Sequence, residues 1–111
     1  MHTRHEQGAA FMAMGYAQAT GRPGVFTAVP GPGMLNAMAA VSTAVAAGQP
    51  VLCITGQIPS YQIGEELGIV HELRDQLAVS RGVVSWSERA DHPRQVPEPV
   101  SYTHLTLPTK A

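Results

Sequence analysis

Glu6 is a carboxyl side chain of this 111-residue sequence that is followed by small and apolar residues, which are consistent with a buried acid but do not show one. Burial of a carboxyl among apolar groups disfavours its charged form and brings its pKa closer to neutrality. Such a group can exchange a proton with a bound ligand. A second interpretation is that Glu6 is a first-turn residue, favoured there by the helix dipole.

The Pro30-Gly31-Pro32-Gly33 turn is the second candidate, since it follows a short apolar strand. Open α/β sheets bind ligands at the carboxyl ends of their strands, and glycine lets a ring approach the backbone closely. A plain strand-to-helix turn is the simpler interpretation, and a dinucleotide cradle is a rival one. The rival lacks its third glycine after Gly33, and the next strand ends in Thr55-Gly56 without an acidic residue.

Asn36 and Gln57 are secondary candidates for the lining of the same pocket. Each could equally satisfy backbone groups at a helix start or a strand end. His71 and Asp75 are spaced four residues apart, which suggests a charged helix face towards solvent or another subunit. The five histidines have no metal-ligand spacing, so no metal site is predicted in this chain.

Four elements would position these residues. Composition and stop signals predict a helix over 5–20, a strand over 25–29, a helix over 34–47 and a strand over 51–55. Gly8 and Gly15 weaken the first helix, which suggests a close approach by another segment. Both strands are almost wholly apolar, which is typical of a parallel sheet covered on both faces. The predicted fold class is therefore α/β, a parallel sheet flanked by helices.

Beyond Gly56 the pattern predicts a loop over 57–69, a helical segment over 70–80 and a third strand over 83–86, with Trp86 in the core. A further helix begins near Asp91 and is stopped by prolines. Residues 100–111 have no helical periodicity, and their codons can spell a string that resembles a transposon end and sequencing adapter. We therefore expect one partial domain over 1–99 and unstructured adapter read-through over 100–111.

Composition excludes several classes of protein. A net charge of -1 leaves no basic surface for nucleic acid or anionic lipid. No run reaches the roughly 20 apolar residues of a membrane helix, and the N-terminus lacks a signal core. Cys53 alone allows no disulfide framework and is predicted to be a buried strand thiol. A cytoplasmic location is the expectation.

Three stretches in order resemble one known family: Arg4 to Ala10 with Gly15-Tyr16-Ala17 and Thr20-Gly21, Pro30 to Gly33 with Asn36, and Val51 to Gln57. Together they resemble the N-terminal, pyrimidine-binding domain of thiamine-diphosphate-dependent enzymes, of the acetolactate synthase and benzoylformate decarboxylase kind. The resemblance implies an incomplete domain, lacking the first strand and helix before Arg4 and continuing past Pro99.

The resemblance also implies roles for particular residues. Glu6 would share a proton with N1′ of the aminopyrimidine, so that the 4′ nitrogen can take the proton of the thiazolium C2. Pro30, Gly31, Asn36 and Gln57 would contribute to binding of the cofactor. Thiamine diphosphate and Mg²⁺ would be clamped by the diphosphate-binding domain of a second subunit, whose Gly-Asp-Gly motif is absent here. A homodimer or homotetramer is therefore expected.

For the parent protein the resemblance implies a 2-oxo acid carboligase of the acetolactate synthase type. A 2-oxo acid decarboxylase of the benzoylformate decarboxylase type is the alternative, although such proteins carry a histidine near the position of Val29. A non-catalytic α/β binding module is a third possibility. The chain by itself is expected to be catalytically inert.

Overall fold

The computed structural model describes residues 1–95. The predicted domain boundary at residue 99 and the predicted adapter read-through over 100–111 fall outside the described residues.

Helix α1 spans Glu6–Thr20 and follows its local signals closely. His5 is extended and caps the helix, because its Nδ1 accepts the Gln7 backbone N–H at 3.0 Å. Gly21 ends the helix with a left-handed φ of 71°, and its N–H donates to the Ala17 carbonyl at 2.9 Å. The helix predicted over 5–20 is confirmed, and Glu6 lies in its first turn.

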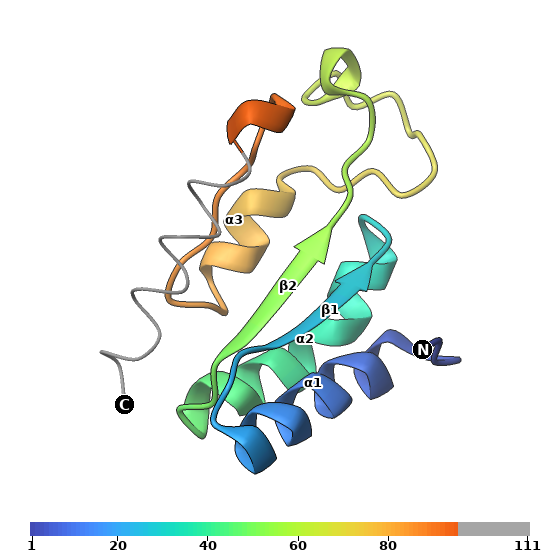
Figure 1. Cartoon of the computed structure of the whole chain (residues 1–111). Helices are drawn as coiled ribbons and strands as arrows, with labels where there is room; N and C mark the ends of the chain where they lie inside the picture. Colours follow the sequence, from blue (N-terminus) through green and yellow to red (C-terminus); the bar gives the residue numbers. More distant parts are fainter. Residues whose placement is uncertain (96–111) are drawn as a thin grey trace.

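Two parallel strands form the sheet: β1 spans Gly24–Ala28 and β2 spans Val51–Thr55. Helix α2 spans Pro32–Ala46 and connects them. In Figure 1 the two long helices lie together against one face of the strands. The α/β prediction, a parallel sheet with flanking helices, is confirmed.

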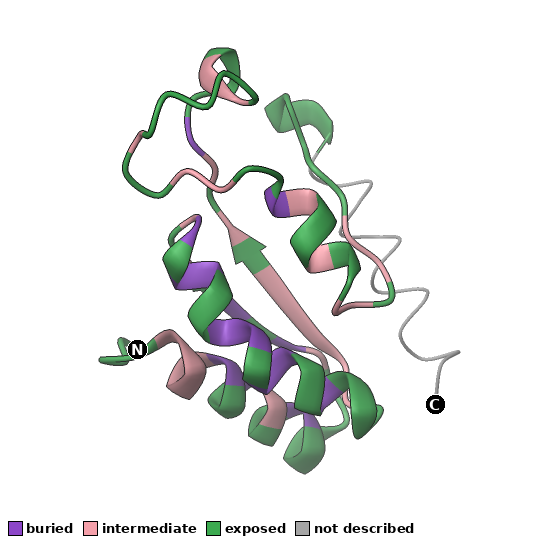
Figure 2. Cartoon of the chain, turned by 180° about the vertical axis from the view of Figure 1, so that it is seen from behind, coloured by how far each residue is buried: buried purple, intermediate pink, exposed green. Residues whose placement is uncertain are grey.

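The core lies between this sheet face and the two helices. Its buried members are mostly small, which allows close packing. They are Ala10, Ala13, Phe26, Met34, Ala37, Met38, Ala40 and Val41. Figure 2 shows how the buried residues gather along α1 and α2.

The close approach that the glycines of α1 suggested occurs at another glycine. A Cβ on Gly15 would meet nothing within 4 Å, and one on Gly8 would make only ordinary contacts with Thr3. At Gly24 of β1, in contrast, a Cβ would collide with the Ala13 carbonyl group. The backbone of α1 therefore packs directly on the start of β1, and Gly24 permits it.

The predicted cover on both sheet faces is wrong for the described residues. Strand partners lie on the same face, and the face that carries Val25 and Ile54 is open, with these side chains 56% and 48% exposed. Both long helices pack on the opposite face, with Phe26. The apolar composition of the strands therefore does not distinguish the covered face from the open one.

The chain after β2 departs most from prediction. A 3-10 turn, η1, spans Ser60–Gln62, and α3 spans only Gln76–Arg81. The helix expected over 70–80 starts late because His71 has a positive φ of 73° and Glu72 closes a local turn with Ile69. His71 and Asp75 therefore share no helix face; Asp75 is the N-cap of α3.

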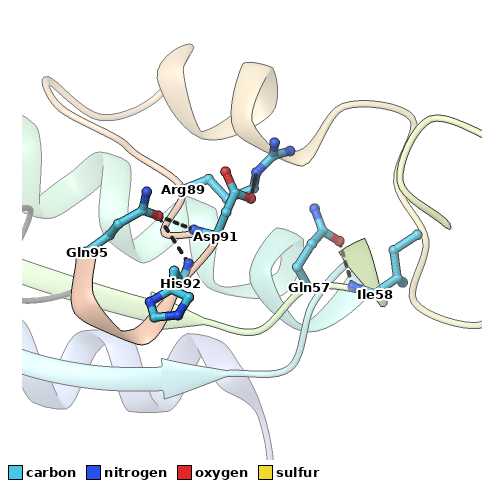
Figure 3. Close-up of polar contacts among 6 residues, drawn as sticks. All are labelled: Gln57, Ile58, Arg89, Asp91, His92 and Gln95. Carbon is cyan, nitrogen blue, oxygen red and sulfur yellow. Dashed lines mark hydrogen bonds and ion pairs between the residues drawn. The ribbon is translucent and has the colours of Figure 1, made fainter. Parts of the chain in front are cut away.

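The third strand predicted over 83–86 is also absent from the described residues. The N–H groups of Val83 and Val84 both donate to the Ser80 carbonyl at the end of α3. Trp86 is half-buried rather than a full core residue. The expected helix near Asp91 is a single 3-10 turn, η2, spanning Pro93–Gln95. Gln95 Oε1 accepts the N–H groups of Asp91 and His92 (Figure 3).

Among residues 1–95, no helix is long and apolar enough to cross a membrane. No group of three His, Cys, Asp or Glu side chains in that part of the chain is arranged to hold a metal ion.

Candidate functional site

Glu6 faces the start of α2. Its Oε1 accepts a hydrogen bond from Asn36 Nδ2 at 3.2 Å, although the two residues are 30 positions apart. Its Oε2 lies 3.5 Å from the place that a Cβ on Gly33 would occupy. The packing of α1 beside α2 therefore brings together three predicted features: the carboxyl group, the amide of Asn36 and the bend that begins at Pro30.

The bend at 30–33 is fixed by the chain itself. Gly31 has a φ of 66° and is the N-cap of α2, without a side-chain cap. A Cβ on Gly31 would collide with the His71 carbonyl, and one on Gly33 would collide with Val29 Cγ2. The expectation that these glycines leave open space for a ring is thus wrong for this chain. Their missing Cβ atoms make room for neighbouring segments of the protein.

Pro30, the first residue of the bend, lies close to the end of β2. A Cβ on Gly56 would lie 3.4 Å from Pro30 Cδ, and the Gly56 N–H donates to the Ala28 carbonyl at 3.4 Å. The carboxyl ends of both strands therefore meet at the bend, whereas the sequence placed the bend only at the end of the first strand.

Gln57 is not part of the group formed by Glu6, Asn36 and the bend. Its Oε1 accepts the backbone N–H of Ile58 at 2.8 Å, as Figure 3 shows. Among residues 1–95 no hydrogen bond links Gln57 to Glu6 or Asn36. The side chain thus satisfies a backbone group after a strand, which was one of its two interpretations.

Gln76 also lies in this region, although the sequence analysis did not identify it as a candidate. It is the buried polar side chain of the described core, 7% exposed, and it lies against the bend. A glutamine in the first turn of a short helix gives no signal of burial. Only its contacts with two distant glycines identify it.

The pKa of Glu6 is lowered from its ordinary value. The largest cause is a hydrogen bond from its own backbone N–H, the second is the Asn36 amide, and His5 adds a small attraction. Desolvation acts in the opposite direction and is outweighed. The expectation that apolar burial holds a proton on Glu6 near neutral pH is therefore wrong for this chain, because donors and solvent surround the carboxylate.

Replacing Asn36 with Ala is expected to raise the pKa of Glu6, since one of the donors that favour the carboxylate is lost. The depressed pKa contributes stability above the ordinary glutamate pKa of about 4.3, and this contribution disappears as the pH falls through the lower folded value. The variant should lose part of it. Carbon-detected NMR titration of the Glu6 carboxyl checks this, with Gln18→Ala on the exposed side of α1 as control. An unchanged or lower Glu6 pKa in the Asn36 variant would count against the contact.

A separate cavity of about 610 Å³ lies along β2, between α2 and residues 84–90. Its lining is mostly apolar and includes Met38, Cys53 and Trp86, but neither Glu6 nor Asn36. Burial raises the pKa of the Cys53 thiol to about 11. Cys53 is thus protonated at neutral pH and is no nucleophile there. Glu6 and Asn36 thus lie outside this cavity, whereas Gln57 and Gln76 contribute to its lining.

Comparison with known proteins gives a consistent picture. Residues 1–79 match the family model described as thiamine pyrophosphate enzyme, N-terminal TPP binding domain. The chain is 41% identical over 105 residues to a "probable 2-ketoarginine decarboxylase" of Pseudomonas aeruginosa, covering 95% of this chain and 19% of that protein. It is 36% identical over 94 residues to the mitochondrial acetolactate synthase catalytic subunit of Saccharomyces cerevisiae, covering 85% and 13%.

A third relative is a chloroplastic acetolactate synthase of Oryza sativa subsp. japonica. It is 49% identical over 63 residues, which cover 57% of this chain and 10% of the relative. The chain thus spans between 10% and 19% of the length of these three relatives.

Proposed function

Because the chain belongs to the thiamine pyrophosphate enzyme family, by its match to the N-terminal TPP binding domain, we propose that it supplies the pyrimidine-activating half of a 2-oxo acid carboligase's active site. The carboligase would be of the acetolactate synthase kind, which two of the three relatives are named as. The observation that carries the proposal is the meeting of Glu6 and Asn36 beside the bend that starts at Pro30.

The polar groups of Glu6 and Asn36 suit an aminopyrimidine, although the glycines of the bend leave no open space for the ring. Asn36 engages Oε1 of Glu6 and leaves Oε2 beside the first turn of α2, so one carboxyl oxygen is oriented while the other can share a proton with N1′ of the ring. Bound thiamine diphosphate supplies the carbon nucleophile for the 2-oxo acid. Glu6 is its proton partner and Asn36 orients the carboxyl. Pro30 and Gly31 belong to the bend that lies beside Glu6 and Asn36.

The lowered pKa of Glu6 supports the proposal that the chain alone is inert. A carboxylate with hydrogen-bond donors and water around it keeps no proton at neutral pH. Covering Glu6 with the ring and with a second subunit removes water and raises its pKa. That subunit would contribute the diphosphate-binding domain with its Mg²⁺, in a homodimer or homotetramer located in the cytoplasm.

A 2-oxo acid decarboxylase is the second candidate, and one comparison favours it. The relative named as a probable 2-ketoarginine decarboxylase matches 95% of this chain. The two reactions differ in what the longer protein makes from a 2-oxo acid: a carbon–carbon-bonded product for a carboligase and an aldehyde for a decarboxylase. A non-catalytic binding module has no need for the Glu6–Asn36 hydrogen bond, which argues against that alternative.

The pure chain is expected to show no turnover of pyruvate and, at most, weak binding of thiamine diphosphate. Calorimetric titrations with thiamine diphosphate and with NAD, run side by side, test the ligand class. Measurable turnover would contradict the division of the site between subunits. Tighter binding of NAD than of thiamine diphosphate would contradict the proposed cofactor.

A further inference from the structure

Gln76 connects the bend at 30–33 with the end of β2. Its Oε1 accepts the buried N–H of Gly31 at 2.8 Å, across 45 positions of sequence. Its Nε2 donates to the Gly56 carbonyl at 3.0 Å, across 20 positions. A single neutral amide thus satisfies a donor on one segment and an acceptor on another. Without it the Gly31 N–H would lose its partner, while the Gly56 carbonyl would keep the Thr55 hydroxyl at 3.3 Å.

The surroundings fix the direction of this side chain. Asp75 caps α3 by accepting the Ala78 N–H at 2.9 Å, so Gln76 is held as the first residue of the helix. The preceding loop also reaches the bend, because the His71 carbonyl occupies the space where a Cβ of Gly31 would lie. The loop from Gly56 to Gln76 therefore begins and ends at the bend, and Gln76 ties both ends together.

Gly31 links Gln76 to the start of α2 through its own backbone groups. Its N–H is held by Gln76, while its carbonyl accepts the Leu35 N–H at 3.0 Å in the first turn of the helix. The next turn carries Asn36, whose amide reaches Glu6 at 3.2 Å. The connection from Gln76 to the carboxyl of Glu6 is thus one continuous series of short contacts through a rigid helix start.

We propose that Gln76 is a positioning residue of the pyrimidine site: its amide fixes Gly31 and so sets the start of α2, with Gly33 and Asn36, against Glu6. The role of that site in thiamine binding rests on the proposed function. The position requires a side chain that both donates and accepts. A methionine would leave the buried Gly31 N–H unpaired, and a carboxylate would place its charge against the Gly56 carbonyl.

Hydrogen exchange of backbone amides in the 111-residue chain tests the proposal without any cofactor. The readout is the exchange rate of the Gly31 N–H divided by that of the Gly24 N–H, which donates to Pro50 in the sheet. In Gln76→Met this ratio is expected to rise about tenfold or more, since the Gly31 N–H loses its partner. Gln18→Met on exposed α1 is the matched control and should leave the ratio unchanged.

Gln76→Glu provides a second variant with its own signature. Once protonated, the carboxyl that this substitution introduces can accept from Gly31 and donate to Gly56 like the amide. The exchange ratio should therefore return towards the wild-type value below the pKa of that carboxyl. An exchange ratio equal to wild type at every pH in both variants overturns the proposal. So does an equal acceleration of all amides, which would mean general destabilisation.

The same variants separate this inference from the proposed function. If Glu6 has no part in cofactor chemistry, the Gly31 exchange ratio still responds to Gln76→Met, and only the link to thiamine fails. If the ratio does not respond while Glu6 proves essential for turnover, the positioning role of Gln76 fails and the proposed function stands.

Discussion

Replacing Glu6 with Gln is expected to lower turnover of a 2-oxo acid about 10²–10⁴-fold in the longer protein that contains this chain. The amide keeps the size of the carboxyl and can still face Asn36, but it cannot take up and return a proton. Turnover at saturating thiamine diphosphate and Mg²⁺ measures the loss. The cofactor should still bind, because its diphosphate is held elsewhere in the proposed assembly.

Glu65→Gln is the matched control, since Glu65 is exposed and has no side-chain hydrogen bond in the described structure. Its turnover should stay within about twofold of wild type. If the Glu6 variant retains more than a tenth of the wild-type turnover, the assignment of Glu6 as the proton partner is wrong. Equal losses in both variants would instead point to a general effect of removing charge.

Replacing Gly31 with Ala is expected to destabilise the chain by about 3 kcal/mol or more. The φ of 66° and ψ of -119° lie outside the left-handed helical region, and such a conformation costs a non-glycine residue roughly 1–3 kcal/mol. The added Cβ would also collide with the His71 carbonyl, and relieving a clash with backbone costs typically about 1–3 kcal/mol. Urea unfolding, followed by circular dichroism, measures the change in free energy of unfolding.

Gly48→Ala is the comparison for a glycine with positive φ and no clash. Gly48 has a φ of 67°, and a Cβ there would meet nothing within 4 Å. It should therefore cost only the roughly 1–2 kcal/mol of backbone strain. Equal destabilisation by both variants would show that the added Cβ at residue 31 meets no costly clash with the His71 carbonyl.

The elements that surround the bend could be predicted because their signals are local. Gly21 stops α1 through its own left-handed backbone, and the prolines and glycines at 30–33 separate β1 from α2 in any tertiary context. The two strands could be predicted from their apolar composition alone. Glu6 and Asn36 could be named as candidates one at a time, but their meeting depends on how closely α1 packs beside α2.

The predictions that failed concern residues whose roles depend on partners distant in the sequence. Residues 83–86 have strand-like side chains, yet Val83 and Val84 use their N–H groups on the end of α3. Gln57 and Gln76 have the same chemistry and are indistinguishable in sequence; one bonds its own neighbour and the other bridges two segments. The pKa of Glu6 likewise depends on which donors surround it, which composition does not encode.

The most direct test of the account is the rate at which the C2 proton of bound thiamine diphosphate exchanges with deuterium in the longer protein. This exchange reports the proton transfer that Glu6 is proposed to support, without any substrate. The account predicts that Glu6→Gln slows the exchange at least about a hundredfold at equal cofactor occupancy. An exchange rate equal to that of the wild-type protein would contradict it.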